Sequence, residues 1–301
     1  IFGGGQYLGS VAVIVAKKYF MDYKELCHQV CLLAMEVGDY LREERLGIEA
    51  LAVEAKGVHD YVTQFDKESE RRIVERLRAL LPESGFIAEE GTASQKGGEK
   101  YVWIVDPLDG TTNFIHGLPV TCVSIGLREG KEMAMGVVYE LWAKECFYAY
   151  KGSEGAYLNG KAIHVSAAQR MNDSMIATGF PYTQFDRMPQ YMRYLEWTMR
   201  NTHGVRRLGS AAADLVYTAC GRCDGFYEYG LKPYDVAAGA YIVERAGGKV
   251  SDFEGEDNWL FGGEIIASNP LIFEEMRQSL HSHLSKPQGI ISTLKARRKK
   301  R

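Results

Sequence analysis

The sequence predicts a mixed α/β fold built in layers, and three observations support that class. Residues 22–45 and 67–81 place apolar side chains at the three- and four-residue spacing of amphipathic helices. Residues 101–165 contain short apolar runs separated by turn signals, which is typical of strands. Beyond about residue 170, strand-like and helix-like segments alternate. Because helices must cover the apolar faces of such sheets, we expect stacked layers.

The N-terminal helix, 22–45, opens with Asp22 and carries Glu25 three residues later, which predicts a capping box. Its buried stripe is predicted to contain Leu26, Val30, Leu33, Val37 and Leu41. Short strands with a turn at Gly57 are expected within residues 51–65. The second helix, 67–81, is expected to end at Pro82.

A short buried strand, Phe86–Ala88, is predicted to deliver Glu89 and Glu90 to a loop. Further strands are expected at 101–105, 120–127, 133–140, 145–150, 156–158, 162–165, 174–179, 224–229, 248–252 and 264–268. Further helices are expected at 188–200, 210–221, 234–246 and 270–284. We interpret 21–285 as one domain with a soft boundary near residue 170, and we expect both halves to contribute to one site.

The composition is that of an ordinary globular protein. The chain has 301 residues, of which 46% are hydrophobic and 25% charged, so it can bury a core without disulfides. Its six cysteines are scattered, which predicts reduced thiols and a cytoplasmic location. Cys220-Gly-Arg-Cys223 lacks a second pair, which disfavours a zinc or redox site. No segment approaches the ~18 apolar residues of a membrane span.

The two ends of the chain differ from the body. Residues 1–20 are interpreted as a non-native or disordered leader, because the basic pair Lys17-Lys18 follows the apolar segment 11–16, the reverse of a secretory signal. Residues 286–301 form a basic tail, in which six of the last seven residues are Lys or Arg. We expect this tail to be disordered, with contact to nucleic acid or anionic lipid as the alternative. The body lacks a basic stripe, which disfavours nucleic acid as a partner.

The run Trp103-Ile-Val-Asp-Pro-Leu-Asp-Gly-Thr-Thr-Asn-Phe114 carries most of the chemical information. An apolar strand leads into Asp106 and Asp109, and Gly110 allows a close approach of the backbone. Thr111 stands where a helical turn can start, and N–H groups at such a start favour an anion. The run therefore predicts a loop that holds hard cations and a phosphate together. The structural alternative is a surface turn in which the aspartates only cap.

Three further acids strengthen the functional interpretation. Glu89 follows a buried strand, and buried carboxylates without partners are costly, so this position needs cations or water. Asp66 and Asp235 each precede an apolar helix, where helix capping is the ordinary alternative. Together with Asp106 and Asp109, these acids indicate metal-assisted hydrolysis of a phosphate ester.

The same residues carry a family resemblance. Phe86-Ile-Ala-Glu-Glu90, the run from Trp103 to Phe114, and Tyr234-Asp-Val-Ala-Ala-Gly239 together resemble the signature of the inositol monophosphatases. These enzymes belong to the lithium-sensitive, Mg²⁺-dependent phosphatase superfamily. The resemblance spans about residues 21–280 and includes Val62-Thr-Gln-Phe-Asp-Lys67, Arg206-Arg-Leu-Gly-Ser-Ala-Ala212 and Phe226-Tyr-Glu-Tyr229. Tyr234, Ala88 and Ser210 depart from the commoner family residues, but none of these changes removes a ligand.

The resemblance implies a five-layer αβαβα sandwich, a homodimer and two or three Mg²⁺ ions per site. It implies metal ligation by the side chains of Glu89, Asp106, Asp109 and Asp235 and by the Leu108 carbonyl. It further implies that Glu89 and Thr111 orient the attacking water, and that Asp66 acts indirectly or on the weakest ion. Substrate contacts are implied for Asp109, Gly110, Thr111, Gly209, Ser210, Ala211, Glu228 and Asp235. Lys56 and Arg206 match less securely because their loops vary.

The expected activity is Mg²⁺-dependent hydrolysis of a small phosphate monoester by an activated water, without a phosphoenzyme. The preferred substrate is myo-inositol 1-phosphate, because Thr112-Asn113-Phe114 resembles the inositol enzymes more than the nucleotide phosphatases. Histidinol phosphate, fructose 1,6-bisphosphate, NADP and 3′-phosphoadenosine 5′-phosphate stay open as substrates of the same fold. A different class of function is a regulatory protein without catalysis that binds nucleic acid through its basic tail.

Overall fold

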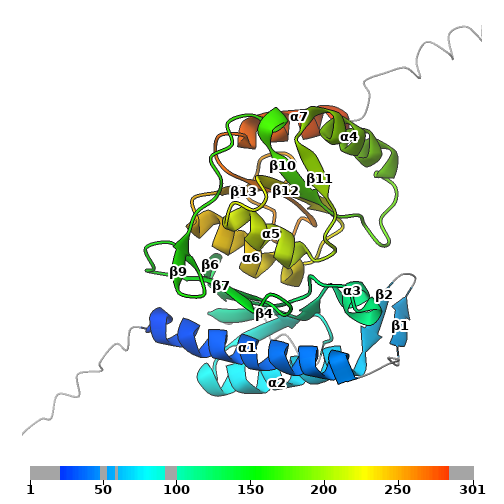
Figure 1. Ribbon diagram of the computed structural model, residues 1–301. Coiled ribbons are helices and arrows are strands. Elements are labelled where there is room, and N and C mark those ends of the chain that lie inside the picture. Colours follow the sequence, from blue (N-terminus) through cyan, green and yellow to red (C-terminus); the bar gives the residue numbers. More distant parts are fainter. Residues whose placement is uncertain (1–20, 48–52, 58–59, 92–99, 285–301) are drawn as a thin grey trace, which may run out of the picture.

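Five layers of alternating helices and sheets make up the fold (Figure 1). The computed structural model describes residues 21–47, 53–57, 60–91 and 100–284. From one side to the other, the layers are α1 and α2, a seven-stranded sheet, α5 and α6, a five-stranded sheet, and α4 with α7. The predicted αβαβα sandwich is confirmed. No helix of the described residues is long and apolar enough to cross a membrane.

The first helical layer forms where the sequence predicts it. The two helices are α1 (Tyr23–Gly47) and α2 (Gln64–Leu80). The Asp22 carboxylate accepts hydrogen bonds from the backbone N–H groups of Lys24 and Glu25, at 3.1 Å each, and so caps α1. The predicted stripe of α1, from Leu26 to Leu41, is buried against the first sheet. A two-stranded ribbon, β1 (Val53–Gly57) with β2 (Asp60–Thr63), connects the helices.

The larger sheet has the strand order β3-β4-β5-β6-β7-β8-β9. Its strands are β3 (Gly85–Ala88), β4 (Tyr101–Asp109), β5 (Cys122–Glu129), β6 (Glu132–Glu140), β7 (Glu145–Tyr150), β8 (Ala156–Leu158) and β9 (Lys161–Ile163). β3 and β4 are parallel and the other pairs are antiparallel. The carboxyl ends of β3 and β4 therefore meet at one edge, which brings Glu89 beside the aspartates of β4.

The middle layer consists of α5 (Ala211–Ala219) and α6 (Pro233–Arg245), which lie between the sheets (Figure 1). Small residues allow the close approach of α6 to both neighbours. A Cβ atom on Gly136 of β6 would lie 2.4 Å from the Ala238 carbonyl oxygen, and one on Gly239 would lie 2.7 Å from Leu215 Cβ. Because no Cβ fits at these contacts, Gly136 sets the distance between α6 and the larger sheet, and Gly239 sets the distance between α6 and α5.

The smaller sheet has the order β11-β10-β12-β14-β13. Its strands are β10 (Met175–Thr178), β11 (Gly204–Arg206), β12 (Gly225–Tyr229), β13 (Lys249–Ser251) and β14 (Glu264–Ser268). The outer helices α4 (Met188–Asn201) and α7 (Phe273–Leu284) bury an aromatic cluster against it, in which Tyr194 packs edge-on to Tyr227 with ring centroids 4.7 Å apart.

Most predicted elements occur within a few residues of their expected bounds. The structure adds the short helix α3 (Thr111–His116), the strand β11 and a 3₁₀ turn, Met171–Asp173, to the predicted elements. β4 runs on to Asp109, four residues beyond the expected end. The interpretations of residues 1–20 and 286–301 lie outside the described residues, and the boundary near residue 170 stays a prediction.

Gly136→Ala is expected to destabilise the protein, because the new methyl group would force α6 away from the sheet. Overpacking of this kind costs about 1–3 kcal/mol. Gly155→Ala is the control, because its Cβ would lie at an ordinary 3.5 Å from the Arg245 carbonyl oxygen. Thermal unfolding followed by circular dichroism should show a lower Tm for Gly136→Ala alone. Equal Tm values for the two variants would contradict the packing argument.

Candidate metal and phosphate site

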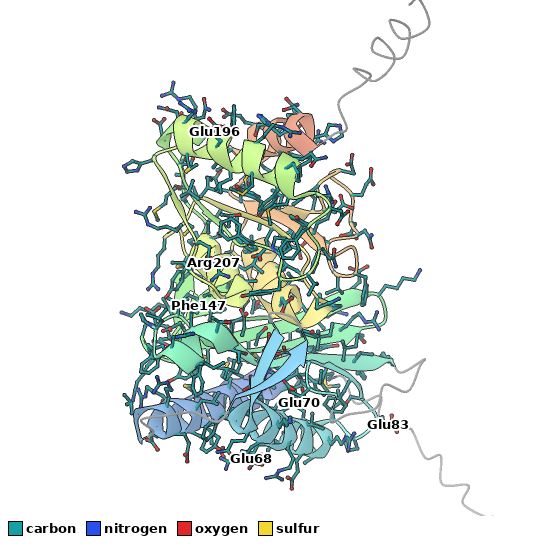
Figure 2. The ribbon with its side chains drawn as sticks, turned by 90° about the vertical axis from the view of Figure 1, so that its right-hand side faces the viewer. Glu68, Glu70, Glu83, Phe147, Glu196 and Arg207 are labelled. Carbon is teal, nitrogen blue, oxygen red and sulfur yellow. The ribbon has the colours of Figure 1, made fainter. Side chains whose placement is uncertain are left out.

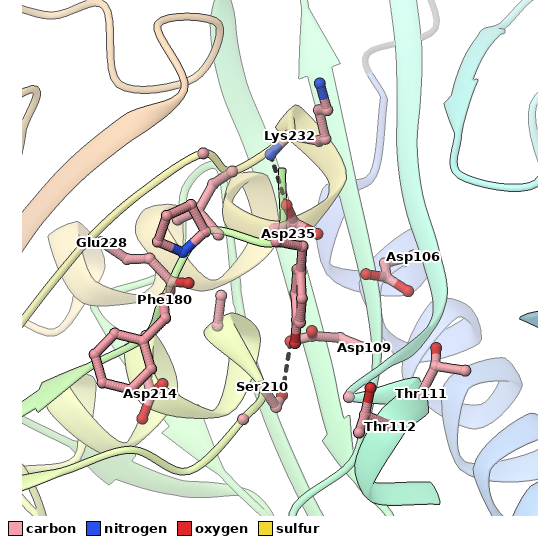
Figure 3. A pocket seen from close by; sticks show the side chains of 18 of the residues that line it. Asp106, Asp109, Thr111, Thr112, Phe180, Ser210, Asp214, Glu228, Lys232 and Asp235 are labelled. Atoms are coloured by element: carbon pink, nitrogen blue, oxygen red, sulfur yellow. Dashed lines mark hydrogen bonds between the residues drawn. The ribbon is translucent and has the colours of Figure 1, made fainter. Parts of the chain in front are cut away.

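A pocket opens where the end of β4 meets the N-terminal ends of α5 and α6 (Figure 3). Of the residues predicted for the site, those that line this pocket are Glu89, Asp106, Leu108, Asp109, Gly110, Thr111, Gly209, Ser210, Ala211, Glu228 and Asp235. They come from five separate segments of the chain. The fold therefore brings the predicted acids and the predicted substrate contacts into one cavity.

An irregularity in β4 gives the two aspartates a common direction. Asp106 pairs with Ser124 and Asp109 pairs with Cys122, so three steps along β4 match two along β5. In a regular strand, residues an odd number apart point to opposite faces. The extra residue turns Asp106 and Asp109 toward the same side, as β-bulges commonly do beside functional sites.

Each of the three clustered aspartates has one oxygen held by a donor from the protein. The Asp109 Oδ2 atom accepts hydrogen bonds from the Ser210 hydroxyl at 2.6 Å and the Ala212 N–H at 2.7 Å. The Asp235 Oδ2 atom accepts one from the Lys232 N–H at 2.6 Å, and the Asp106 Oδ1 atom accepts one from the Leu108 N–H at 3.0 Å. Figure 3 shows the Ser210 and Lys232 bonds as dashed lines.

The bond from Lys232 shows that Asp235 takes part in capping α6, one of the two roles predicted for it. Asp235 is the third residue of α6 and reaches back to the N–H of Lys232, the residue that precedes the helix. Its carboxylate thus caps the helix and also faces the other aspartates. One carboxylate oxygen from each of Asp106, Asp109 and Asp235 lies within 4.8 Å of the other two.

The cluster is electrostatically unfavourable without a cation. Burial and the nearby Glu89 raise the pKa of Asp106 well above its usual value. Burial raises the pKa of Asp109 to about 6, although Ser210 and Ala212 oppose the shift. Burial and Asp109 also raise the pKa of Asp235. Because like charges converge here in a buried setting, the donor set is one that hard divalent cations fit.

Glu89 reaches the cluster through a loop that is tied to α2. Its N–H donates to the Val105 carbonyl at 3.3 Å, which extends the β3–β4 pairing by one residue. The N–H of Glu90 donates to the Glu70 carboxylate on α2 at 2.6 Å. Glu70 is buried and lies in the lower helical layer in Figure 2. The Glu89 loop is thus anchored from two sides.

Thr111 joins Asp66 to the pocket. The Thr111 hydroxyl lies 3.1 Å from Asp66 Oδ1 and 3.0 Å from the Leu108 carbonyl oxygen, and both atoms are acceptors. Asp66 is itself buried on α2 and does not line the cavity. The hydroxyl hydrogen of Thr111 is therefore directed to these acceptors, which leaves the lone pairs of its oxygen for a further donor.

The other part of the pocket is lined by residues of β12, of α5 and of the segment 179–183 that follows β10. The Glu228 carboxylate packs against Gly179, where a Cβ atom would lie 2.1 Å from both carboxylate oxygens. Burial raises the pKa of Glu228 to about 8, although Arg207 lowers it. Arg207 donates a hydrogen bond to the Tyr182 hydroxyl at 3.1 Å, and Figure 2 shows it at mid-height between the two sheets.

Besides Asp66, one predicted position, Arg206, does not line the pocket. Arg206 is exposed, bonds the neighbouring Val205 carbonyl and does not line the cavity, whereas Arg207 does. The side chain of Lys56 lies outside the described residues. Arg207 was missed because two adjacent arginines carry no signal for which one faces inward. Asp214 was also missed, although a single carboxylate in the apolar run 211–219 is itself a signal.

The metal-free protein is expected to be less stable at about pH 8.5 than at about pH 6. The folded-state pKa values of Asp109 and Glu228 are about 6 and about 8, above the usual values of carboxyl groups. The stability that comes from keeping these groups protonated is complete below about pH 4 and is lost as the pH rises through the raised values. Thermal unfolding in the presence of EDTA measures this, and added Mg²⁺ should restore Tm at the higher pH.

Glu228→Gln should reduce the fall of Tm with rising pH between about pH 7 and 9. Glu68→Gln is the control, because hydrogen bonds from Arg71 and Arg72 lower the pKa of the half-buried Glu68 to about 2, outside this window. A wild-type Tm in EDTA that does not fall between these pH values would contradict the electrostatic account.

The sequence of the chain matches a known protein family and several of its members. The sequence profile described as the inositol monophosphatase family matches residues 22–286. An inositol-1-monophosphatase from Mesorhizobium japonicum is 38% identical over 252 residues, which cover 84% of this chain and 94% of that protein. The Nus factor SuhB of Escherichia coli K12 is also 38% identical, with the same coverage of both chains.

Solved structures give the same result. The extragenic suppressor protein suhB from Bartonella henselae superposes with a TM-score of 0.81 at 38% identity, covering 88% of this chain and all of that one. The IMPase of Thermotoga maritima superposes with a TM-score of 0.77 at 35% identity, covering 86% and 98% of the two chains. With its motifs, fold and acidic pocket in agreement with these matches, the chain belongs to the inositol monophosphatase family.

Proposed function

We propose that the protein hydrolyses a small phosphate monoester with the help of two or three Mg²⁺ ions. The observation that carries the proposal is the convergence of Asp106, Asp109 and Asp235, whose oxygens lie within 4.8 Å of one another. Glu89 borders the same cavity and lies close enough to raise the pKa of Asp106. Membership of the inositol monophosphatase family supports phosphatase activity and metal binding.

The metal ligands in this proposal are Glu89, Asp106, Asp109, Asp235 and the Leu108 carbonyl. One oxygen of each clustered aspartate is held by a backbone or hydroxyl donor, and these bonds orient the three carboxylates toward a common centre. Magnesium held there would supply the Lewis acidity that activates a water and offsets the charge of the phosphate ester. Binding of the cation would also relieve the repulsion among the carboxylates.

Thr111 and Glu89 are proposed to orient the attacking water. Asp66 and the Leu108 carbonyl occupy the hydroxyl hydrogen of Thr111, so its oxygen can accept a hydrogen bond from water. The water then keeps a lone pair for phosphorus. Asp66 acts through Thr111 in this account and contacts no substrate.

The phosphate is assigned to the turn that Gly110 makes between β4 and α3. Gly110 has φ of +93°, and a Cβ there would lie 3.1 Å from the Val120 carbonyl and 3.2 Å from that of Gly209. Only glycine fits such a position, and its absence of a side chain leaves the backbone of Gly110 and Thr111 open to the substrate. Asp109 and Asp235 are proposed to contact the substrate as well as the ions.

The alcohol part of the substrate is assigned to Gly209, Ser210, Ala211 and Glu228. A carboxylate at Glu228 suits hydroxyl groups better than a second phosphate, which supports myo-inositol 1-phosphate over fructose 1,6-bisphosphate. Histidinol phosphate, NADP and 3′-phosphoadenosine 5′-phosphate are the competing substrates. We further propose a cytoplasmic homodimer that is inhibited by lithium, as the family resemblance implies.

Asp109→Asn is expected to abolish turnover while the fold survives. The amide removes one negative charge from the cluster, and its oxygen is a weaker ligand, so phosphate release should fall by ~10³-fold or more. Phosphate release with Mg²⁺ is measured for the five esters named above, with myo-inositol 1-phosphate expected to be fastest. Asp173→Asn, which changes an exposed aspartate paired with Arg170, is the control and should keep full activity. Turnover by Asp109→Asn at the wild-type rate would refute the ligand assignment.

A second candidate function is favoured by the names of the relatives. Proteins called Nus factor SuhB match this chain at 38% identity, as closely as the inositol-1-monophosphatase does. A regulatory role is therefore the alternative, with the basic segment 295–301 as the contact to nucleic acid. Deletion of residues 295–301 should then abolish salt-dependent binding to a single-stranded RNA, measured by fluorescence anisotropy. Unchanged binding after the deletion would remove the tail from this alternative.

A further inference from the structure

Asp214 is a buried acid that the proposed chemistry does not use. It lies on α5, is 1% exposed and lines the pocket. Within the described part of the chain, its Oδ1 atom has no hydrogen-bond partner. A buried polar atom without a partner costs free energy, and such cases in folded proteins call for an explanation. A ligand that enters the pocket would supply the missing partner.

The surroundings of Asp214 disfavour a carboxyl group, so an apolar residue at this position would make the folded protein more stable. Burial and the charges of Glu228 and Asp109 raise the pKa of Asp214 well above its usual value, and Arg207 alone opposes the shift. The carboxyl group of Asp214 is thus present at this position although Glu228 and Asp109 disfavour its charged form. Figure 3 shows Asp214 on the same side of the pocket as Glu228 and Phe180.

The helix that carries Asp214 also positions the metal cluster. The Asp214 N–H donates to the Ser210 carbonyl at 3.0 Å, one turn earlier on α5. Ser210 and Ala212 hold the Asp109 carboxylate. Asp214 is not among the clustered aspartates of the described residues, and it lies on the same side of the pocket as Glu228, which is assigned to the alcohol.

We propose that Asp214 is a specificity residue that, together with Glu228, selects phosphate esters whose leaving alcohol carries several hydroxyl groups. This inference rests on the proposed phosphatase function and adds a second carboxyl group to its alcohol subsite. A polyol offers neighbouring O–H donors, so one hydroxyl can bond to Asp214 while another bonds to Glu228. An alcohol without further hydroxyls would leave both carboxyl groups unsatisfied.

Hydroxyl groups fit this subsite better than an ammonium group. An O–H group can donate to a carboxylate and can also accept from a protonated carboxyl, whereas an ammonium group only donates. Arg207 already supplies a positive charge that acts on Asp214, Glu228 and Asp109. A substrate cation would be repelled by that guanidinium.

The test compares kcat/KM for myo-inositol 1-phosphate with kcat/KM for phenyl phosphate, using the full chain with Mg²⁺. Asp214→Ala should raise KM for the inositol ester about tenfold and leave kcat/KM for phenyl phosphate within about twofold. Asp214→Asn keeps an amide oxygen that accepts a hydrogen bond, so its selectivity should fall by only about threefold. Neither variant should lower Tm, because each removes a buried carboxyl group whose Oδ1 atom has no partner.

Glu140→Ala is the matched control. Glu140 is also a buried acid with one unpartnered oxygen among the described residues, but it does not line the pocket. Its loss should leave the ratio of the two kcat/KM values unchanged, whatever it does to stability.

Three outcomes would overturn the inference. Equal losses on both esters would make Asp214 a structural residue, and unchanged selectivity in both Asp214 variants would remove it from the subsite. A selective loss of histidinol phosphate hydrolysis would mean that the two acids recognise a cation. If the wild type releases phosphate from none of the esters, the proposed function fails and this inference fails with it.

Discussion

Mutual repulsion among the carboxylates of Asp106, Asp109 and Asp235 is the constraint on which the structure of the site depends. Separate segments of chain bring these groups to within 4.8 Å of one another, with burial adding to the cost. Hydrogen bonds from Ser210, Lys232 and the adjoining backbone offset part of that cost and fix where each carboxylate lies. The remaining negative charge is the basis of the cation binding that we propose for the cluster.

The middle helical layer is what makes this convergence possible. β4 supplies two of the acids, and the N-terminal turns of α5 and α6 supply the donors and the third acid. Backbone N–H groups at a helix start have no partner inside the helix, so they are suited to hold carboxylates. The glycine contacts at Gly136 and Gly239 keep both helices close enough for these short bonds to form. The layer formed by α5 and α6 therefore both packs the two sheets together and positions the residues of the site.

Much of the fold and of the site could be predicted because their signals are local. The apolar stripe from Leu26 to Leu41 and the strand-to-acid run at Asp106 are legible in the sequence alone. The bulge in β4 was not predictable, because an extra residue shows itself only against the partner strand. The same limit applies to the choice between Arg206 and Arg207. The short strand β11 ends at Arg206, and tertiary contacts decide which of the two side chains faces the pocket.

The position of α5 links metal binding to recognition of the alcohol. Ser210 and Ala212 hold Asp109, and Asp214 follows one turn later on the same rigid helix. A displacement of α5 would move the donors that hold Asp109 together with the Asp214 carboxyl group, since both lie at its N-terminal end. Leu215, which packs against Gly239 of α6, fixes the helix at that point. In the function proposed above, a change at the contact between Leu215 and Gly239 would therefore alter the ion site and the alcohol subsite together.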